Sequence, residues 1–201
     1  TKHTYKENFM FYFSSHVKAL KYRLIAITWY KYFMGNIGKH TIIASPVKIK
    51  NPKTINIGNN VYIDSHAWLY GEKTGISKLN IDSGTQIGRF FHCVAYKTVE
   101  IQKNVLIAER VFISDCNHGY YDILSPILSQ QIYHISNVVI GSDTWIGEGV
   151  SIIGIGKHCV IGANAVVTSD IEDYCVAVGN PARIIKKYNK KTDAWEKIND
   201  S

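Results

Sequence analysis

Residues 138–150, Val-Val-Ile-Gly-Ser-Asp-Thr-Trp-Ile-Gly-Glu-Gly-Val, contain two isoleucine-glycine pairs, at 140–141 and at 146–147. A small or β-branched residue follows each isoleucine by four positions. Units of this kind, in which an aliphatic residue precedes Gly, Asp or Ala, recur in steps of six along much of the chain. Further copies begin at Ile57, Ile63, Ile81, Ile87, Ile107, Ile155 and Ile161. A six-residue repeat therefore organises the middle of the sequence.

This period excludes one continuous helix and one long strand. An amphipathic helix repeats its apolar residues at about 3.6 positions and a half-buried strand at 2. Short strands joined by tight corners fit a period of six, because each unit can send its aliphatic side chain inward. Glycine tolerates the backbone conformations that such corners require. A β-sandwich or β-barrel is the alternative, but those folds do not keep one phase over so many units. We therefore predict an all-β fold of stacked coils.

Residues 55–182 resemble the hexapeptide-repeat acyltransferases, a family whose fold is a left-handed parallel β-helix. With three hexapeptides in each triangular coil, we expect coils to open near Ile57, Ile81, Ile101, Ile140 and Ile155. The long step from Ile101 to Ile140 predicts one loop insertion, residues 119–137, that leaves the prism after His118. The short step from Ile140 to Ile155 predicts a tighter coil.

Apolar residues at helical spacing precede the repeats. They are Phe9, Phe13, Val17, Leu20, Leu24, Ile27 and Tyr30. We expect an N-terminal helical cap over residues 1–40, a β-helix domain over 41–185 and a C-terminal tail over 186–201. One interpretation of the helix is a cap on the open end of the prism, which stacked repeats require. The other is a basic amphipathic helix that rests on a membrane carrying a lipid-linked acceptor.

The composition of the 201-residue chain suits one globular domain. Its net charge is +7, but the basic residues are spread out and form no recognition-helix pattern, so we expect no nucleic-acid partner. No apolar run is long enough to span a membrane, and no secretory signal is recognisable. The four cysteines form no CxxC pair. A cytoplasmic location is expected, with peripheral contact with the inner face of the membrane as the alternative.

Residues 113–119, Ile-Ser-Asp-Cys-Asn-His-Gly, lie where the repeat gives way to the insertion. They resemble the D-x-N-H-G stretch of sugar O-acetyltransferases that act in polysaccharide synthesis. The resemblance implies that His118 is the general base, and imidazole suits the deprotonation of a sugar hydroxyl near neutral pH. Asp115 is predicted to orient His118 or hold the acceptor, with a structural corner role as the alternative. Asn117 is predicted to bind the sugar or to cap the turn.

Other chemistry is conceivable at the same segment. Cys116 invites a thiol-nucleophile interpretation, although the relatives transfer acetyl directly. A metal site formed by Asp115, His118 and His134 lacks the usual H-x-x-x-H spacing, so we predict no metal. Trp145 stands at an outward position of its hexapeptide. It is predicted either to wall the acceptor site or to pack against a neighbouring subunit.

Residues 161–171 and 178–183 resemble the family's IGA-x-(S/A)-VVT-x-DI and G-N-P-A-(R/K) ending. The resemblance implies acetyl-CoA as co-substrate, with its pantetheine arm beside Ala163 and Thr168 in a groove between subunits. Arg183, with Lys186 or Lys187, is predicted to meet the CoA phosphates, since arginine offers forked donors to phosphate oxygens. A solvated tail is the alternative for these basic residues.

The oxyanion of the transition state is expected to meet a backbone N–H near Gly147 or Glu148.

The resemblance is closest to the sugar O-acetyltransferases of the maltose and galactoside type, and it implies a homotrimer. The predicted function is acetyl transfer from acetyl-CoA to a hydroxyl of a sugar or polysaccharide precursor, in the biosynthesis of a surface polysaccharide. One alternative is N-acetylation of an amino sugar or nucleotide amino sugar. Another is a non-catalytic or metal-binding β-helix assembly.

Overall fold

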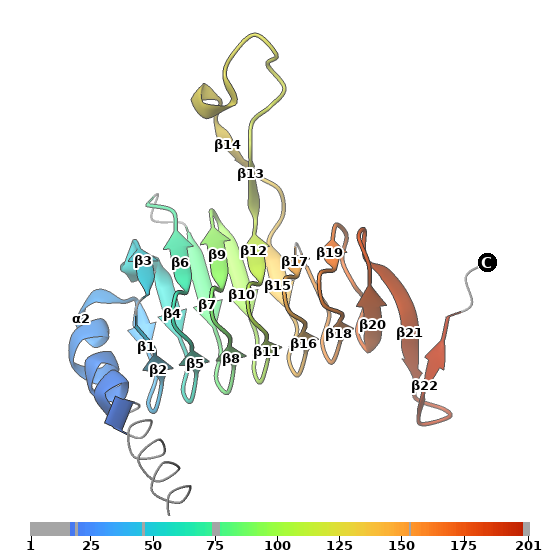
Figure 1. The fold of residues 1–201 in the computed structure, drawn as a ribbon, viewed down its shortest axis with the longest axis horizontal. Coiled ribbons are helices and arrows are strands. Elements are labelled where there is room, and N and C mark those ends of the chain that lie inside the picture. The colour runs from blue at the N-terminus through green and yellow to red at the C-terminus, as the bar shows by residue number, and fades with distance from the viewer. Residues whose placement is uncertain (1–16, 19, 46, 74–76, 153, 199–201) are drawn as a thin grey trace, which may run out of the picture.

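The computed structural model describes residues 17–18, 20–45, 47–73, 77–152 and 154–198. The chain is a left-handed parallel β-helix whose coils stack side by side along one axis (Figure 1). Three sheets form the faces of the prism. Face A contains β1 (Asn36–Ile37), β4 (Ile55–Ile57), β7 (Lys78–Ile81), β10 (Thr98–Ile101) and β15 (Val138–Ile140).

Faces B and C complete each coil. Face B begins with β2 (Ile42–Ile43), β5 (Tyr62–Ile63), β8 (Gln86–Ile87), β11 (Leu106–Ile107), β16 (Trp145–Ile146) and β18 (Val160–Ile161). Its last strands are β20 (Cys175–Val178), β21 (Arg183–Asn189) and β22 (Ala194–Lys197). Face C contains β3 (Lys48–Lys50), β6 (Trp68–Gly71), β9 (His92–Ala95), β12 (Phe112–Ser114), β17 (Ser151–Ile152) and β19 (Val166–Val167).

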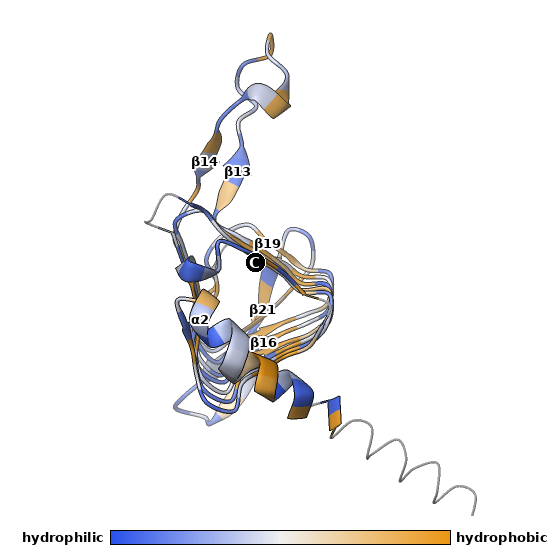
Figure 2. Ribbon diagram, turned by 90° about the vertical axis from the view of Figure 1, so that its left-hand side faces the viewer, coloured by the Kyte–Doolittle hydropathy of each residue, from blue (hydrophilic) through white to orange (hydrophobic). Residues whose placement is uncertain are grey.

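The core is a ladder of aliphatic side chains at equivalent positions in successive coils. On face A the register is Ile37, Ile57, Ile81, Ile101 and Ile140, and bridges continue it to Ile155 and Ile171. From Ile57 onward these residues are at most 5% exposed. All five predicted coil openings are confirmed, as is the short coil that ends at Ile155. Figure 2 shows the three-sided section of the prism.

Glycine is required where successive corners touch. A Cβ on Gly141 would lie 2.3 Å from the backbone nitrogen of Lys157 in the next coil, too close for any side chain. Corner residues such as Asn104 and Asn164 have φ near +58°, a conformation that asparagine tolerates better than most residues. These contacts explain why the second residue of the repeat is so often glycine.

The first coil begins earlier than the sequence predicted. Strand β1 pairs with β4 in register, so the predicted boundary at residue 40 falls inside a coil. Its units, Ile37-Gly38 with Thr41 and Ile43-Ala44 with Val47, follow the same repeat, so the earlier start can be read from the sequence.

The N-terminal helix covers the end of the prism only with its last turns. Residues 20–25 are α-helical, followed by a π-helical turn, η1 (Ala26–Tyr30), and α2 (Lys31–Phe33). Ala26 and Met34 are buried, and Tyr30 packs against the core. Val17, Leu20 and Leu24 are about half exposed, so this part of the helix does not bury its apolar side chains against the prism. The predicted apolar positions Phe9 and Phe13 lie outside the described residues.

The insertion is a β-arm that projects from the prism (Figure 1). Strand β13 (Cys116–His118) pairs antiparallel with β14 (Ile132–His134), and a 3-10 turn, η3 (Ile127–Ser129), lies near the tip. The predicted start after His118 is wrong, because His118 pairs with Ile132 and belongs to the arm itself.

The C-terminal segment is a hairpin added to face B. Strand β21 pairs antiparallel with β20 and with β22, so the predicted tail boundary at residue 186 falls inside a strand. Lys186 and Lys187 are therefore held in a sheet rather than in a solvated tail. Among the described residues, no helix is long and apolar enough to cross a membrane.

Candidate active site

His118 lies on the first strand of the β-arm, close to its base. The arm is fastened there by backbone hydrogen bonds from Gly119 to Gln131 and from Ile135 to Asp115, both 2.9 Å. The His118 and Asn117 side chains are exposed. Ring and amide therefore face the space beside the arm rather than the core of the prism.

Asp115 holds the base of the arm to the prism. Its side chain is 0% exposed, and its carboxylate accepts hydrogen bonds from three consecutive backbone N–H groups. The donors are Tyr96, Lys97 and Thr98, at 2.6, 2.7 and 2.8 Å. His134 Nε2 lies 3.9 Å from the same carboxylate. Of the roles that the sequence left open for Asp115, its complete burial and these three contacts favour the structural corner.

Aromatic side chains line the outer surface of face C beside the arm. The register places Lys48, Trp68, His92 and Phe112 in one outward row, and the row continues to Ser151 and Val166. The rings of Trp68 and His92 stack with centroids 4.3 Å apart, and Phe112 is tilted against His92 at 5.1 Å. A second row holds Lys50, Tyr70, Val94 and Ser114.

Burial and the nearby Lys48 ammonium hold the pKa of His92 below its ordinary value of 6.5. The His92 imidazole is therefore neutral near pH 7 and packs as an aromatic ring between Trp68 and Phe112.

Two pockets open on face C and meet beneath the arm. The first, the β9 pocket, has a volume of about 390 Å³. It is lined by the aromatic residues of the two rows, by Lys50, and by His118 and Ile132 of the arm, whereas Lys48 lies outside the lining. The second, the β19 pocket, has a volume of about 310 Å³ and extends toward the C-terminal coils. The two share Phe112, Ser114, Cys116 and Asn117. A ligand in the β9 pocket and a ligand in the β19 pocket would therefore meet at these shared residues, next to His118.

The Cys116 thiol lies at this junction but is poorly suited to attack a thioester. Its Sγ is 3.5 Å from Ser114 Oγ. Burial raises the pKa of the thiol above 9, and the Ser114 contact only partly offsets this rise. Because the thiolate is the nucleophile, a raised pKa disfavours an acyl-cysteine.

The β19 pocket contains one of the predicted cofactor-binding residues. Thr168 lines it together with Ser151, Val166 and Val167, which are small or β-branched. Thr168 follows β19 at the edge of face C from which the arm also rises. A narrow chain with polar amides, such as a pantetheine arm, fits a pocket of this size and composition.

Gly147, Glu148 and Ala163 lie at the opposite edge of face C, in the corners between faces B and C. A Cβ on Gly147 would lie 2.7 Å from the Ala163 nitrogen, so these corners are stacked directly on one another. The Gly147 N–H donates to the Ile161 carbonyl at 2.8 Å. The Gly147 N–H is therefore not free to bind an oxyanion, and the prediction for this group is wrong. The Glu148 carboxylate forms an ion pair with Arg110.

Trp145, Arg183 and Lys186 lie on face B, away from His118. Trp145 is 52% exposed and shares an outward row with Leu106, which is 48% exposed. The register continues through Val160 and Val176 to Lys186. The predicted acceptor and phosphate contacts are thus split between two faces of the same prism.

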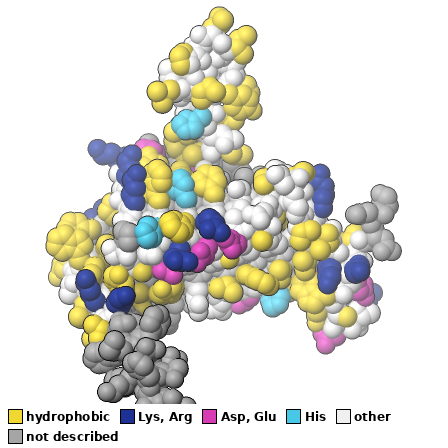
Figure 3. Space-filling model, in the orientation of Figure 1, with side chains coloured by type: hydrophobic (Ala, Val, Ile, Leu, Met, Phe, Trp, Pro, Cys, Tyr) yellow, Lys and Arg dark blue, Asp and Glu magenta, His cyan; other side chains and the backbone are white. Residues whose placement is uncertain are grey.

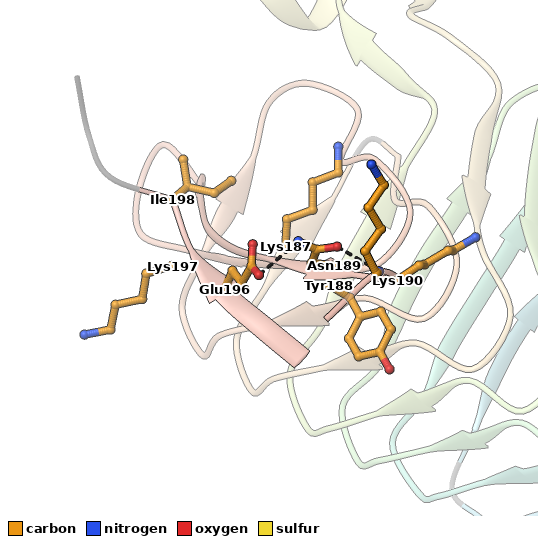
Figure 4. A pocket seen from close by; sticks show the side chains of 8 residues that line it. Lys187, Tyr188, Asn189, Lys190, Glu196, Lys197 and Ile198 are labelled. Atoms are coloured by element: carbon orange, nitrogen blue, oxygen red, sulfur yellow. Dashed lines mark hydrogen bonds between the residues drawn. The ribbon is translucent and has the colours of Figure 1, made fainter. Parts of the chain in front are cut away.

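Lys187 lies apart from Lys186. It pairs in register with Cys175, whose side chain is buried, so Lys187 covers the C-terminal end of the core and forms an ion pair with Glu172. The C-terminal hairpin forms a basic pocket of about 430 Å³ (Figure 4). Its lining includes Lys187, Lys190 and Lys191 but neither Arg183 nor Lys186.

Asp115 and His134 approach one another, as the metal alternative requires. Within the described ranges, however, no group of three or more His, Cys, Asp or Glu side chains is placed to hold a metal ion.

Sequence reasoning missed the aromatic rows on face C. Trp68, His92 and Phe112 each precede an inward residue of the core ladder by one position: Leu69, Cys93 and Ile113 respectively. Aligning the coils by their inward residues would have placed the three rings in one row.

A comparison with known protein-family models gives no match. Among individual proteins, the chain is 37% identical over 165 residues to the putative lipopolysaccharide biosynthesis O-acetyl transferase WbbJ of Escherichia coli K12. That alignment covers 78% of this chain and 83% of the relative. An identity of 37% over this share of both chains establishes that the two proteins belong to one family.

Solved structures agree with this assignment. A galactoside acetyltransferase in complex with coenzyme A is similar with a TM-score of 0.57 and 27% identity, covering 85% of this chain and 76% of that one. AntD, an N-acyltransferase from Bacillus cereus in complex with dTDP and 3-hydroxybutyryl-CoA, has a TM-score of 0.65 at 23% identity. The matched region covers 81% of this chain and 87% of AntD. At 23% identity, this similarity supports the fold alone. The chain belongs to the hexapeptide-repeat sugar acetyltransferases and is an acetyl-CoA-dependent acyltransferase.

Proposed function

We propose that this enzyme transfers the acetyl group of acetyl-CoA to a hydroxyl of a sugar, with His118 as general base. The observation that carries the proposal is the junction of the β9 and β19 pockets beside His118. In this arrangement the β19 pocket receives the pantetheine arm and the β9 pocket receives the acceptor. The relatives named as O-acetyltransferases support a hydroxyl as the acceptor group.

His118 takes the proton from the acceptor hydroxyl as a bond forms between that oxygen and the thioester carbonyl carbon. When the carbon–sulfur bond breaks, His118 returns the proton to the departing sulfur. The products are the acetylated sugar and coenzyme A with a free thiol, so no covalent enzyme intermediate is needed. The raised pKa of Cys116 agrees with this direct route.

We further propose that the complete site forms between subunits of a homotrimer. His118 and Thr168 belong to the side of face C, whereas Trp145, Arg183 and Lys186 lie on face B. One prism cannot bring both faces to one ligand. Packing face B of one subunit against face C of the next would bury the exposed Trp145 and bring the basic side chains to the donor pocket.

N-acetylation of an amino sugar is the second candidate, and the fold similarity to the N-acyltransferase AntD motivates it. A histidine base would serve both reactions, so the product must be examined directly. The putative relative in lipopolysaccharide biosynthesis motivates a polysaccharide precursor as acceptor.

The test is thiol release from acetyl-CoA with a panel of sugars, amino sugars and nucleotide sugars. We expect a product whose acetyl group is removed by neutral hydroxylamine, as an ester is. An acetyl group that resists hydroxylamine would be an amide and would favour the N-acetyl alternative. Failure to bind coenzyme A in equilibrium dialysis would contradict both.

A further inference from the structure

The outer surface of face C carries two cations that the acetyl-transfer reaction does not use. Lys48 and Lys50 lie on β3, at the end of the aromatic rows that leads away from the β19 pocket. Figure 3 shows dark blue basic side chains beside yellow and cyan ones at the foot of the arm. They occupy the far end of the surface on which the acceptor is proposed to bind.

Both ammonium groups are held over aromatic rings. Lys48 Nζ lies 3.9 Å from the ring centroid of Trp68, and Lys50 Nζ lies 4.8 Å from that of Tyr70. Neither lysine belongs to any ion pair found among the described residues. An ammonium over a ring face is directed by the ring but keeps its hydrogen-bond donors available. The pair is thus positioned and still able to bind an anion.

A carboxylate lies near one of the two cations. Glu72 accepts a hydrogen bond from the Tyr70 hydroxyl, which lowers the pKa of the carboxyl group, and the Lys50 charge lowers it further. Lys50 is therefore partly compensated. The Lys48 charge is felt instead by the neutral His92 ring, so it is not compensated by a carboxylate, but Lys50 is the one of the two that lines the β9 pocket.

The spacing of the rows indicates which part of an acceptor would reach these cations. Neighbouring strands are about 4.8 Å apart, so the Trp68 ring under Lys48 is about 10 Å from the Phe112 ring, two strands along. A distance of about 10 Å is longer than one sugar ring. It matches a sugar ring together with the substituent on the side of the ring away from the reactive hydroxyl. Between the two ends, the Trp68 and His92 rings are stacked face to face on one another, so they offer their edges to a ligand as an apolar lining.

We propose that the β9 pocket binds an acceptor sugar that carries a phosphate or diphosphate. The phosphate contacts are Lys50, which lines the pocket, and Lys48, which lies two residues earlier on β3 and just outside the lining. This inference rests on the proposed function, because it assumes that the reactive hydroxyl lies at His118. Two sources share this chemistry, a nucleotide sugar and a lipid-linked sugar diphosphate.

Binding can be measured without turnover, so this test is separate from that of the general base. Titration calorimetry would compare methyl glucoside, glucose 1-phosphate and UDP-glucose on the full-length protein. We expect UDP-glucose to bind at least about tenfold more tightly than methyl glucoside, because two charge-assisted contacts are added. The Lys48→Gln/Lys50→Gln variant should lose this difference. The matched control, Lys39→Gln/Lys103→Gln, removes the same charge from corners of the prism and should retain it.

Equal affinity for the phosphorylated and neutral ligands in wild type would overturn the proposal, as would a preference that persists in Lys48→Gln/Lys50→Gln. Absence of binding to all three at millimolar concentration would also overturn it. UDP-glucose binding more tightly than glucose 1-phosphate would assign the nucleotide source. Equal binding of these two, with tighter binding of a polyprenyl diphosphate glucose in detergent micelles, would assign the lipid source. If His118→Ala kept full turnover while the lysine result held, only the proposed base would fail.

Discussion

Replacing Asp115 by asparagine separates its structural role from a catalytic one. The carboxylate is fully buried and accepts three backbone N–H groups, one on Oδ1 and two on Oδ2. Asparagine has almost the same shape, and with its oxygen at the Oδ2 position it can still accept from Lys97 and Thr98. Its amino group would then face the Tyr96 N–H, and two donors would oppose one another. One hydrogen bond is lost, and the two that remain are made to a neutral acceptor.

Each such bond contributes about 1.5–3 kcal/mol. The loss of one therefore gives at least about 1.5 kcal/mol less free energy of unfolding for Asp115→Asn. Urea unfolding, followed by circular dichroism at matched protein concentration, measures this. Asp143→Asn is the control. Asp143 is an exposed corner residue at φ +60° with one side-chain partner, Asn104, and its replacement should cost less than about 0.5 kcal/mol.

The reasoning would be refuted if Asp115→Asn were as stable as Asp143→Asn. If such a stable Asp115→Asn variant also lost turnover, Asp115 would be an orienting group for His118, as one of the sequence interpretations holds. The structure instead predicts that Asp115→Asn is less stable than Asp143→Asn. Any loss of turnover in Asp115→Asn would then be caused by a loosened arm.

Three further predictions concern other groups at the site. Cys116→Ser should keep turnover within about threefold. In wild type, the raised pKa keeps Cys116 a thiol, so it should react with iodoacetamide more slowly than a free cysteine at pH 8, and faster as pH rises. Detection of an acetylated Cys116 peptide during turnover would contradict this. Lys48→Gln should raise the pKa of His92 in an NMR titration, since the Lys48 charge helps to lower it. A histidine with a lowered pKa contributes stability above its unfolded value of about 6.5 that is lost as pH falls through the folded-state pKa, so the variant should lose less stability on acidification. Trp145→Asp should reduce the mass measured by sedimentation from that of a trimer to that of a monomer, and an unchanged trimer would show that face B is not the interface.

The coils could be predicted from the sequence because each inward position admits only a small set of side chains. Ile57, Ile81, Ile101 and Ile140 stack directly, so their spacing in the sequence is the length of each coil. The first coil carries the same units at Ile37-Gly38 and Ile43-Ala44, so its start was predictable from the same repeat.

For the candidate site, the sequence proposes residue types but does not give their placement. His118 was identified by its neighbours, yet its position on the arm depends on the pairing of β13 with β14, which brings together residues distant in sequence. The role of Asp115 depends on three N–H groups of the preceding coil, and no pattern within residues 113–119 records them. Side chains such as Trp145 were known to point outward, but which face they occupy follows only from the register.

His118 is proposed as the general base at the junction of the two pockets. The most direct measurement is the rate of thiol release from acetyl-CoA by His118→Ala, wild type and the control His158→Asn, with one acceptor that wild type uses. His158 lies in a corner between faces A and B at φ +52°, which asparagine tolerates. We expect kcat to fall at least about a hundredfold in His118→Ala, with coenzyme A affinity unchanged, and to stay near wild type in His158→Asn. A His118→Ala enzyme that binds coenzyme A and turns over at the wild-type rate would contradict the claim.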